Sequence, residues 1–428
     1  MLSRQTSSSG DKDCSTRAED VPTQRTGSSG GAMLNLVCVV IGTGALNLAH
    51  TLQQSGWLGL LLVGVSGAVS VFTGVLVIRS LDQAGGARRL GQLGQAAFGL
   101  AGRIAVHVLH CVVVVGSVGD YIILAGQSFD RLARAGGHGS SETAWKIGCA
   151  AAMWAGCIGL RHMSDAVALA LLGSATSLSA VLIGAMQALR HPYRGSGPAP
   201  HAPAYHRLWN GAGAAVALAT ISFAYCAVAV MPAVEASMRR PGHWTTVLGL
   251  AMGIVTAVYL LVAAAGYWAF GDQTAAPFLD NLPPGAATSA ARILISLHVI
   301  LAAPIMATSF ALEIEAALGL TQERWGKWRE LALRVALRSL FFVAMTAIAL
   351  AVPFFGDVMA LVGAFSTSLL LCVVPVVCYI RICGWRTLSW PMLIACLAVF
   401  ALGIYTCVLG AKGAIEDLRK DIAARGRQ

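Results

Sequence analysis

Apolar runs near 20 residues long recur from one end of this 428-residue chain to the other. A helix of roughly 20 apolar residues crosses the hydrocarbon core of a bilayer, and a helix keeps its backbone hydrogen bonds internal where lipid offers none. Charged residues make up 12% of the chain, against about 25% in soluble domains. The pattern predicts an all-α integral membrane protein with about 11 transmembrane helices. We place them at residues 33–53, 57–80, 102–128, 144–160, 166–189, 212–235, 244–270, 288–314, 332–351, 357–380 and 389–411.

The ends of the chain differ from its centre. Residues 1–31 are rich in Ser, Thr and Gly and hold no apolar core, which predicts a disordered cytosolic tail rather than a signal peptide. Residues 32–412 form the predicted transmembrane domain and residues 413–428 a short basic tail. The loop Lys and Arg residues favour a cytosolic N-terminus, although an odd span count then places the basic C-terminal tail outside. The sequence does not distinguish the plasma membrane from a vacuolar or lysosomal-type membrane.

The first apolar run is interrupted at its centre by Gly42-Thr43-Gly44. Discontinuous helices of this kind form the binding sites of secondary transporters, while close helix packing through small residues is the alternative interpretation. The sixth run is interrupted at Pro232. Two groups of five spans, each led by an interrupted helix, predict an inverted repeat followed by one extra span.

Four ordered motifs resemble the amino acid/auxin permease family. Residues 41–57, IGTGALNLAHTLQQSGW, are similar to its first-helix motif, and residues 231–241, MPAVEASMRRP, to its sixth helix and exit loop. Residues 266–272, GYWAFGD, and 280–283, DNLP, are similar to its seventh-helix end and the next loop, the latter especially in the vesicular inhibitory amino acid transporter branch. The resemblance implies a LeuT-like fold with helices 1 and 6 broken, and ion-driven amino acid transport. The usual first-helix proline is Ala49 here.

The break suggests a place for an amino acid. Backbone N–H groups at a helix N-terminus suit a carboxylate, and carbonyl groups released by the breaks suit an ammonium group. Phe223 and Tyr225 are expected to wall the side-chain pocket, although core packing is the alternative for Phe223. Asn47 is expected to contact substrate or to form a helix–helix hydrogen bond. The predicted substrate-binding residues are Gly42, Thr43, Gly44, Ala45, Asn47, Phe223, Ala224 and Tyr225.

Ionisable residues at membrane depth are costly and are therefore functional candidates. Asp120, in the third run, is the deepest acid, and His298 and His50 lie in the eighth run and after the first break. These three are the predicted ion-coupling residues, with buried hydrogen bonding as the alternative role. Glu235 and Arg239 lie at the cytosolic end of the sixth run, where they form either a gate ion pair or a solvated helix end.

The eighth apolar run indicates which ion drives transport. Sodium-coupled members of the family place a threonine before the eighth-span proline, whereas Ala302 and Ala303 precede Pro304 here. Proton coupling is therefore favoured over sodium. The eleven cysteines form no CxxC pair, so no metal site and no cofactor are expected.

The expected function is transport of small or neutral amino acids across the bilayer by alternating access. The expected partners are the amino acid and the lipid bilayer. Neither a nucleic-acid partner nor an enzyme activity is expected, because the net charge of +10 is assigned to topology and no enzyme motif is present. A transport-dead amino acid sensor with the same fold and an uncoupled facilitative carrier are the alternatives.

Overall fold

The computed structural model describes residues 25–85, 89–160, 166–192, 204–351 and 355–425. Within these ranges the regular structure is helical, apart from an isolated bridge between Gly27 and Met238. The α-helices are α1 Ser29–Val40, α2 Thr43–Ser55, α3 Gly59–Gln83, α4 Leu90–Ala135, α5 Glu142–Gly159, α6 Val167–Arg190, α7 Ala214–Ala224, α8 Met231–Ser237, α9 Trp244–Phe270, α10 Ala286–Ala317, α11 Gln322–Trp325, α12 Lys327–Ala351, α13 Phe355–Val362, α14 Val374–Cys383, α15 Trp390–Tyr405 and α16 Ala411–Arg425.

Short helical segments join or continue these helices. Those with 3-10 geometry are η2 Pro241–His243, η3 Gly271–Gln273, η4 Phe278–Asn281 and η7 Trp385–Thr387. Those with π geometry are η5 Gly363–Thr367, η6 Leu369–Val373 and η8 Thr406–Gly410.

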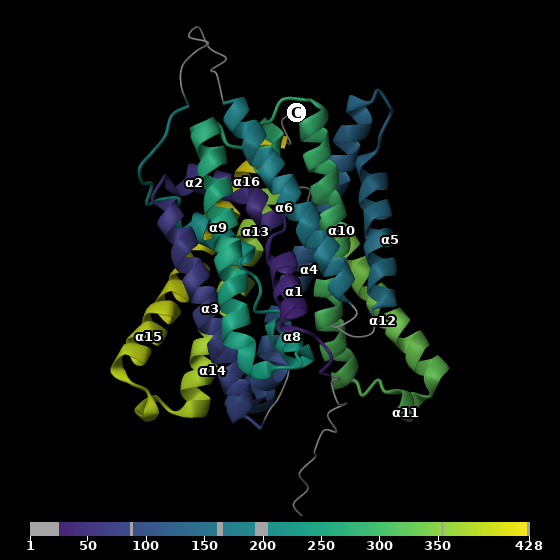
Figure 1. Cartoon of the computed structure of the whole chain (residues 1–428), viewed down its shortest axis with the longest axis vertical. Coiled ribbons are helices and arrows are strands. Elements are labelled where there is room, and N and C mark those ends of the chain that lie inside the picture. Colours follow the sequence, from purple (N-terminus) through teal and green to yellow (C-terminus); the bar gives the residue numbers. More distant parts are fainter. Residues whose placement is uncertain (1–24, 86–88, 161–165, 193–203, 352–354, 426–428) are drawn as a thin grey trace, which may run out of the picture.

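Helices occupy all of the predicted apolar runs. In the described part of the chain, 8 helices are long and apolar enough to cross a membrane, and the bent pair α1 and α2 makes a ninth span. The two other predicted runs are α5, with 18 residues, and the interrupted pair α7 and α8. In Figure 1, α1 begins towards the lower end and the C-terminus lies at the upper end, which requires an odd number of crossings.

Both predicted interruptions are present, for different local reasons. Gly42 separates α1 from α2 in a conformation that is neither helical nor extended, with φ −126° and ψ −135°, and the two helices are bent by 48°. Pro232 lies in the first turn of α8, where a residue without an N–H is tolerated. Turns over residues 225–230 separate α7 from α8.

The centre of the bundle holds the broken helices. Figure 1 shows α1 in the interior, and it packs on α6, α9 and α8. Helix α10 packs extensively on α6 and α4. At the outer sides, α12 and α15 expose apolar residues such as Leu340, Val343 and Ile394. Apolar residues on an outward helix face suit lipid contact.

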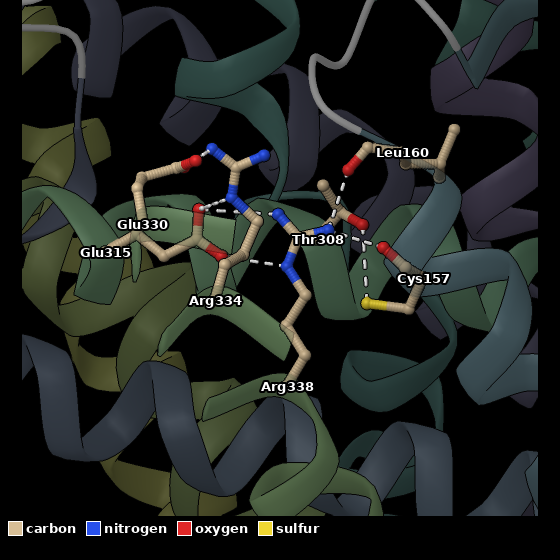
Figure 2. Close-up of polar contacts among 7 residues, drawn as sticks. All are labelled: Cys157, Leu160, Thr308, Glu315, Glu330, Arg334 and Arg338. Carbon is tan, nitrogen blue, oxygen red and sulfur yellow. Dashed lines mark hydrogen bonds and ion pairs between the residues drawn. The ribbon is translucent and has the colours of Figure 1, made fainter. Parts of the chain in front are cut away.

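A buried ionic network joins α5, α10 and α12 (Figure 2). The Arg338 side chain is 0% exposed and donates from Nε to Glu315 Oε1 at 2.8 Å, while Nη1 donates to the Leu160 carbonyl at 2.7 Å and to that of Cys157. Arg334 pairs with both Glu315 and Glu330. The sequence places Arg338 at a cytosolic flank, but it lies in the interior because its planar donor fork finds a full set of acceptors there.

The helices extend into both predicted tails. Helix α1 begins at Ser29, before the predicted boundary at residue 31, because the Ser28 side chain accepts a hydrogen bond from Gly31 N at 3.0 Å. Helix α16 runs on to Arg425, beyond the predicted boundary at residue 412. Residues 1–24 of the predicted disordered tail lie outside the described residues.

Arg338→Met should lower the free energy of unfolding by about 3 kcal/mol, because Glu315 would keep a buried charge with only Arg334 beside it. Thermal unfolding of the purified protein in detergent measures the effect. Adding Glu315→Gln to Arg338→Met should recover part of the loss. The exposed Arg329→Met is the matched control. Equal melting temperatures for Arg338→Met and the control would contradict the assigned role.

Candidate functional site

The break between α1 and α2 lies against the end of α7, and a small cavity opens between them. Its volume is about 10 Å³, close to the room that one water molecule requires. It is lined by Val39, Val40, Gly42, Thr43, Gly44, Ser117, Tyr121, Phe223, Ala224, Cys226 and Met306. The two interrupted helices therefore meet at one point, and an amino acid fits there only if the surrounding helices separate.

Five of the eight predicted substrate-binding residues line this cavity, and three do not. Ala45 and Asn47 are buried farther along α2, and Asn47 Oδ1 has no hydrogen-bond partner among the described residues. The Tyr225 hydroxyl lies 2.9 Å from Thr256 Oγ1 on α9. Tyr225 therefore points towards α9 rather than into the cavity.

Gly44 allows the two broken helices to touch. A Cβ added at Gly44 would lie 2.7 Å from both Cα and Cβ of Ala224, which is closer than carbon atoms approach without displacement. Its missing side chain therefore serves helix packing as well as access to the backbone. The packing interpretation therefore applies at Gly44, and the role of the glycine motif in binding stays a prediction.

His298 faces the break from α10. Its Nδ1 lies 2.9 Å from the Gly173 carbonyl oxygen on α6, and because a carbonyl only accepts, Nδ1 is the donor. Its Nε2 is buried without a partner among the described residues, and it would lie 3.1 Å from a Cβ added at Gly42. The Tyr121 hydroxyl would lie 3.3 Å from the same Cβ. His298 thus presents a free acceptor nitrogen to the break.

Asp120 reaches the same break from α4. Its side chain is 0% exposed, and the Thr43 hydroxyl lies beside its carboxylate. Neither carboxylate oxygen completes a hydrogen bond within the described ranges. The predicted coupling residues Asp120 and His298 therefore both lie next to Gly42 and Thr43.

His50 lies away from this point. Its Nδ1 is 2.9 Å from the Thr274 carbonyl oxygen, and its Nε2 is 3.4 Å from Gln54 Nε2. The contact with Thr274 joins the far part of α2 to the loop after α9, and the contact with Gln54 lies within α2. The structure gives His50 a role in holding that loop.

The predicted gate residues contact the N-terminal segment. Glu235 Oε1 lies 3.9 Å from Arg25 Nη1, and the backbone N–H of Arg239 donates to the Gly27 carbonyl at 2.8 Å. Gly27 N–H in turn donates to the Ser237 carbonyl at 2.9 Å. The end of α8 is therefore tied to the residues that precede α1, and Glu235 forms an ion pair with Arg25.

Two further polar groups on these helices lie outside the predicted site residues. The Tyr259 hydroxyl on α9 lies 2.9 Å from the Ala224 carbonyl oxygen and also contacts that of Val40. Farther along α4, His110 Nδ1 is 2.8 Å from Glu313 Oε2 on α10. A helical spacing between His107 and His110 was the one available signal for the second group.

Comparison with known proteins identifies the family. The family described as "Transmembrane amino acid transporter protein" matches residues 25–416. The chain belongs to this family. "Amino acid transporter AVT1B" of Arabidopsis thaliana is 28% identical over 421 residues, covering 94% of this chain and 73% of that protein. "Amino acid transporter AVT1C" of the same organism is 27% identical over 433 residues, covering 97% and 74%. The predicted family is confirmed, and it is a family of transporters rather than enzymes.

Solved structures confirm the predicted fold. Mhp1, a nucleobase-cation-symport-1 family transporter in a closed conformation, superposes with a TM-score of 0.56 at 11% identity, covering 94% of this chain and 95% of that one. A Na⁺-coupled sialic acid symporter gives 0.56 at 10% identity, covering 93% of each. The protein is an all-α, multi-pass membrane protein with a LeuT-like fold.

Gly44→Ala should reduce amino acid uptake about 5- to 100-fold per folded molecule, because overpacking of about 1–3 kcal/mol forces α2 and α7 apart. Radiolabelled uptake normalised to protein recovered by gel filtration measures this. Gly253→Ala on α9 is the control, since a Cβ there meets nothing within 4 Å. Uptake equal to that of the control would show that close contact at Gly44 is dispensable.

Proposed function

We propose that this protein is a proton-coupled secondary transporter of small neutral amino acids, working by alternating access. One observation carries the proposal: the Asp120 carboxylate lies beside Thr43, at the point where α1 is broken against α7. A titratable group and the released backbone groups of two helices thus share one location. Protonation there is positioned to change how the break binds its ligand.

The helix ends supply the two halves of a zwitterion site. Helix α2 begins at Thr43 without a side-chain cap at Gly42, and the positive dipole end of a helix favours a carboxylate. The C-terminal carbonyl groups of α1 and α7 present the opposite polarity to an ammonium group. Phe223 lines the cavity between them. Its ring and the small volume favour a short, uncharged side chain.

The hydroxyl groups of α10 support the proton over sodium. Ser309 Oγ donates to the Met306 carbonyl at 2.7 Å, and Thr308 Oγ1 lies 3.6 Å from Cys157 Sγ. Both hydroxyls are therefore engaged away from the break. Asp120 and His298, in contrast, present atoms without hydrogen-bond partners in the described part of the chain.

The orientation proposed from the loop charges is a cytosolic N-terminus. Arg25 and Arg239 lie beside the start of α1, and α11, which contains Arg324, lies at the same lower end in Figure 1. This is consistent with an excess of basic residues on the cytosolic side.

Uptake of labelled amino acids into proteoliposomes, with and without an imposed proton gradient, tests the function. We expect gradient-driven accumulation of small neutral amino acids, and no requirement for sodium. Binding without uptake under any gradient would instead identify a sensor. Uptake that does not depend on the proton gradient would identify a facilitative carrier.

Asp120→Asn should abolish accumulation driven by the proton gradient while leaving exchange of internal for external substrate within about 3-fold of the wild type, because an amide cannot carry the proton. Asp417→Asn, in the exposed pair with Lys420 on α16, is the matched control. Gradient-driven accumulation by Asp120→Asn equal to that of the control would remove Asp120 from the coupling mechanism.

A further inference from the structure

The C-terminal ends of both half-helices meet one tyrosine. Tyr259 on α9 is 0% exposed, and its hydroxyl contacts the carbonyl of Val40, the last residue of α1. The same hydroxyl lies 2.9 Å from the carbonyl oxygen of Ala224, the last residue of α7. One phenol thus joins two helix ends that are about 180 residues apart in sequence and whose dipoles both point their negative ends at it.

A phenol has a single proton to donate. It can therefore satisfy one of these two carbonyl groups at a time. The Val40 carbonyl also accepts a hydrogen bond from Gly42 N–H at 2.8 Å. The Ala224 carbonyl receives no other hydrogen bond within the described residues. Gly42 N–H thus serves the Val40 carbonyl and the Tyr259 hydroxyl serves the Ala224 carbonyl, so the second acceptor position of each carbonyl is open to a ligand, in a place where lipid supplies no donor.

The surroundings leave little space beside the hydroxyl. A Cβ added at Gly44 would lie 3.3 Å from the Tyr259 hydroxyl. A group that bonded to both carbonyls at once would have to take nearly the same position as the phenol oxygen. Tyr225 does not compete for this position, because its hydroxyl pairs with Thr256 at 2.9 Å.

We propose that the Tyr259 hydroxyl is the resident hydrogen-bond donor at the joined ends of α1 and α7, and that the α-ammonium group of the substrate displaces it. This inference rests on the proposed amino acid transport. An ammonium group brings three N–H donors and satisfies both carbonyls together, which the phenol does not. Tyr259 is in this view a positioning residue that competes with substrate and holds the two helix ends together in its absence.

Tyr259→Phe keeps the ring and removes the competitor. The Kd for L-alanine should fall about 3- to 10-fold, the effect of one hydrogen bond, and the melting temperature without ligand should also fall. Binding is measured by the ligand-induced rise in melting temperature of the full-length protein. Tyr267→Phe on the same helix is the control: its hydroxyl accepts from Arg207 N–H at 2.8 Å, away from the break. It should lower stability without tightening binding.

Ligands without an ammonium group show whether Tyr259→Phe tightens binding by removing a competing donor or only by making space in the site. Propionate and N-acetylalanine lack the ammonium group, so Tyr259→Phe should not tighten their binding. The proposed role of Tyr259 would be overturned if Tyr259→Phe lowered the Kd for these analogues as much as the Kd for alanine. It would also be overturned if the Kd for alanine stayed the same or rose. Should Tyr259→Phe not fold, replacement of Tyr259 by 3-fluorotyrosine strengthens the donor and should raise the Kd for alanine; a lowered or unchanged Kd would overturn the proposal.

The wild-type protein separates this inference from the function on which it rests. If no member of an amino acid panel raises the melting temperature of the wild type, both the transport proposal and the displacement of Tyr259 fail. If the wild type responds and Tyr259→Phe shows no ammonium-dependent gain, the displacement alone fails.

Discussion

A bilayer supplies no hydrogen bonds to a backbone that leaves the helix, and the centre of this protein is arranged around that constraint. Breaking α1 at Gly42 and α7 at Ala224 releases carbonyl and N–H groups in the middle of the bundle. Other helices have to bring partners to them, and the Tyr259 hydroxyl of α9 contacts both carbonyl ends. A side chain of an unbroken neighbouring helix thus supplies a hydrogen-bond donor at the ends of the two broken helices.

Helix α10 connects this centre to one end of the molecule. Glu313 and Glu315 are two positions apart, so they point to opposite sides of the helix, since each residue turns the helix by about 100°. Glu313 accepts hydrogen bonds from His110 and from the Gly91 backbone of α4, while Glu315 pairs with Arg338 of α12. One helix therefore carries two buried acids that join it to separate neighbours, and its His298 faces the break.

The sequence predicted what local patterns encode. The apolar runs, the interruption at Gly42 and the buried acid Asp120 can each be recognised within a few residues, and the structure has helices, a break and a buried carboxylate at these places. The directions of Tyr225 and Asn47 were not predictable in this way. Helix α7, which ends just before Tyr225, is almost entirely apolar and so has no face by which its orientation can be read.

Contacts between segments that are far apart in the sequence were also not predictable. Arg25 meets Glu235 and Tyr259 meets Val40 across intervals of about two hundred residues. The burial of Arg338 depends on carbonyl groups at the end of α5. A count of basic residues treats Arg338 as a loop charge, although a neighbouring carboxylate neutralises it in the interior. Such pairings depend on helix packing, which no short motif specifies.

The pairing of the N-terminal segment with α8 sets a mechanical limit on α1. Gly27 is hydrogen-bonded to Ser237 and Arg239, and a single residue, Ser28, separates it from the first residue of α1. Because each residue extends the chain by at most about 3.6 Å, the start of α1 can lie no more than about 7 Å from Gly27 while that pairing lasts. The segment before α1 therefore limits how far the start of the helix can move. A larger movement of α1 requires the hydrogen bonds of Gly27 to break first.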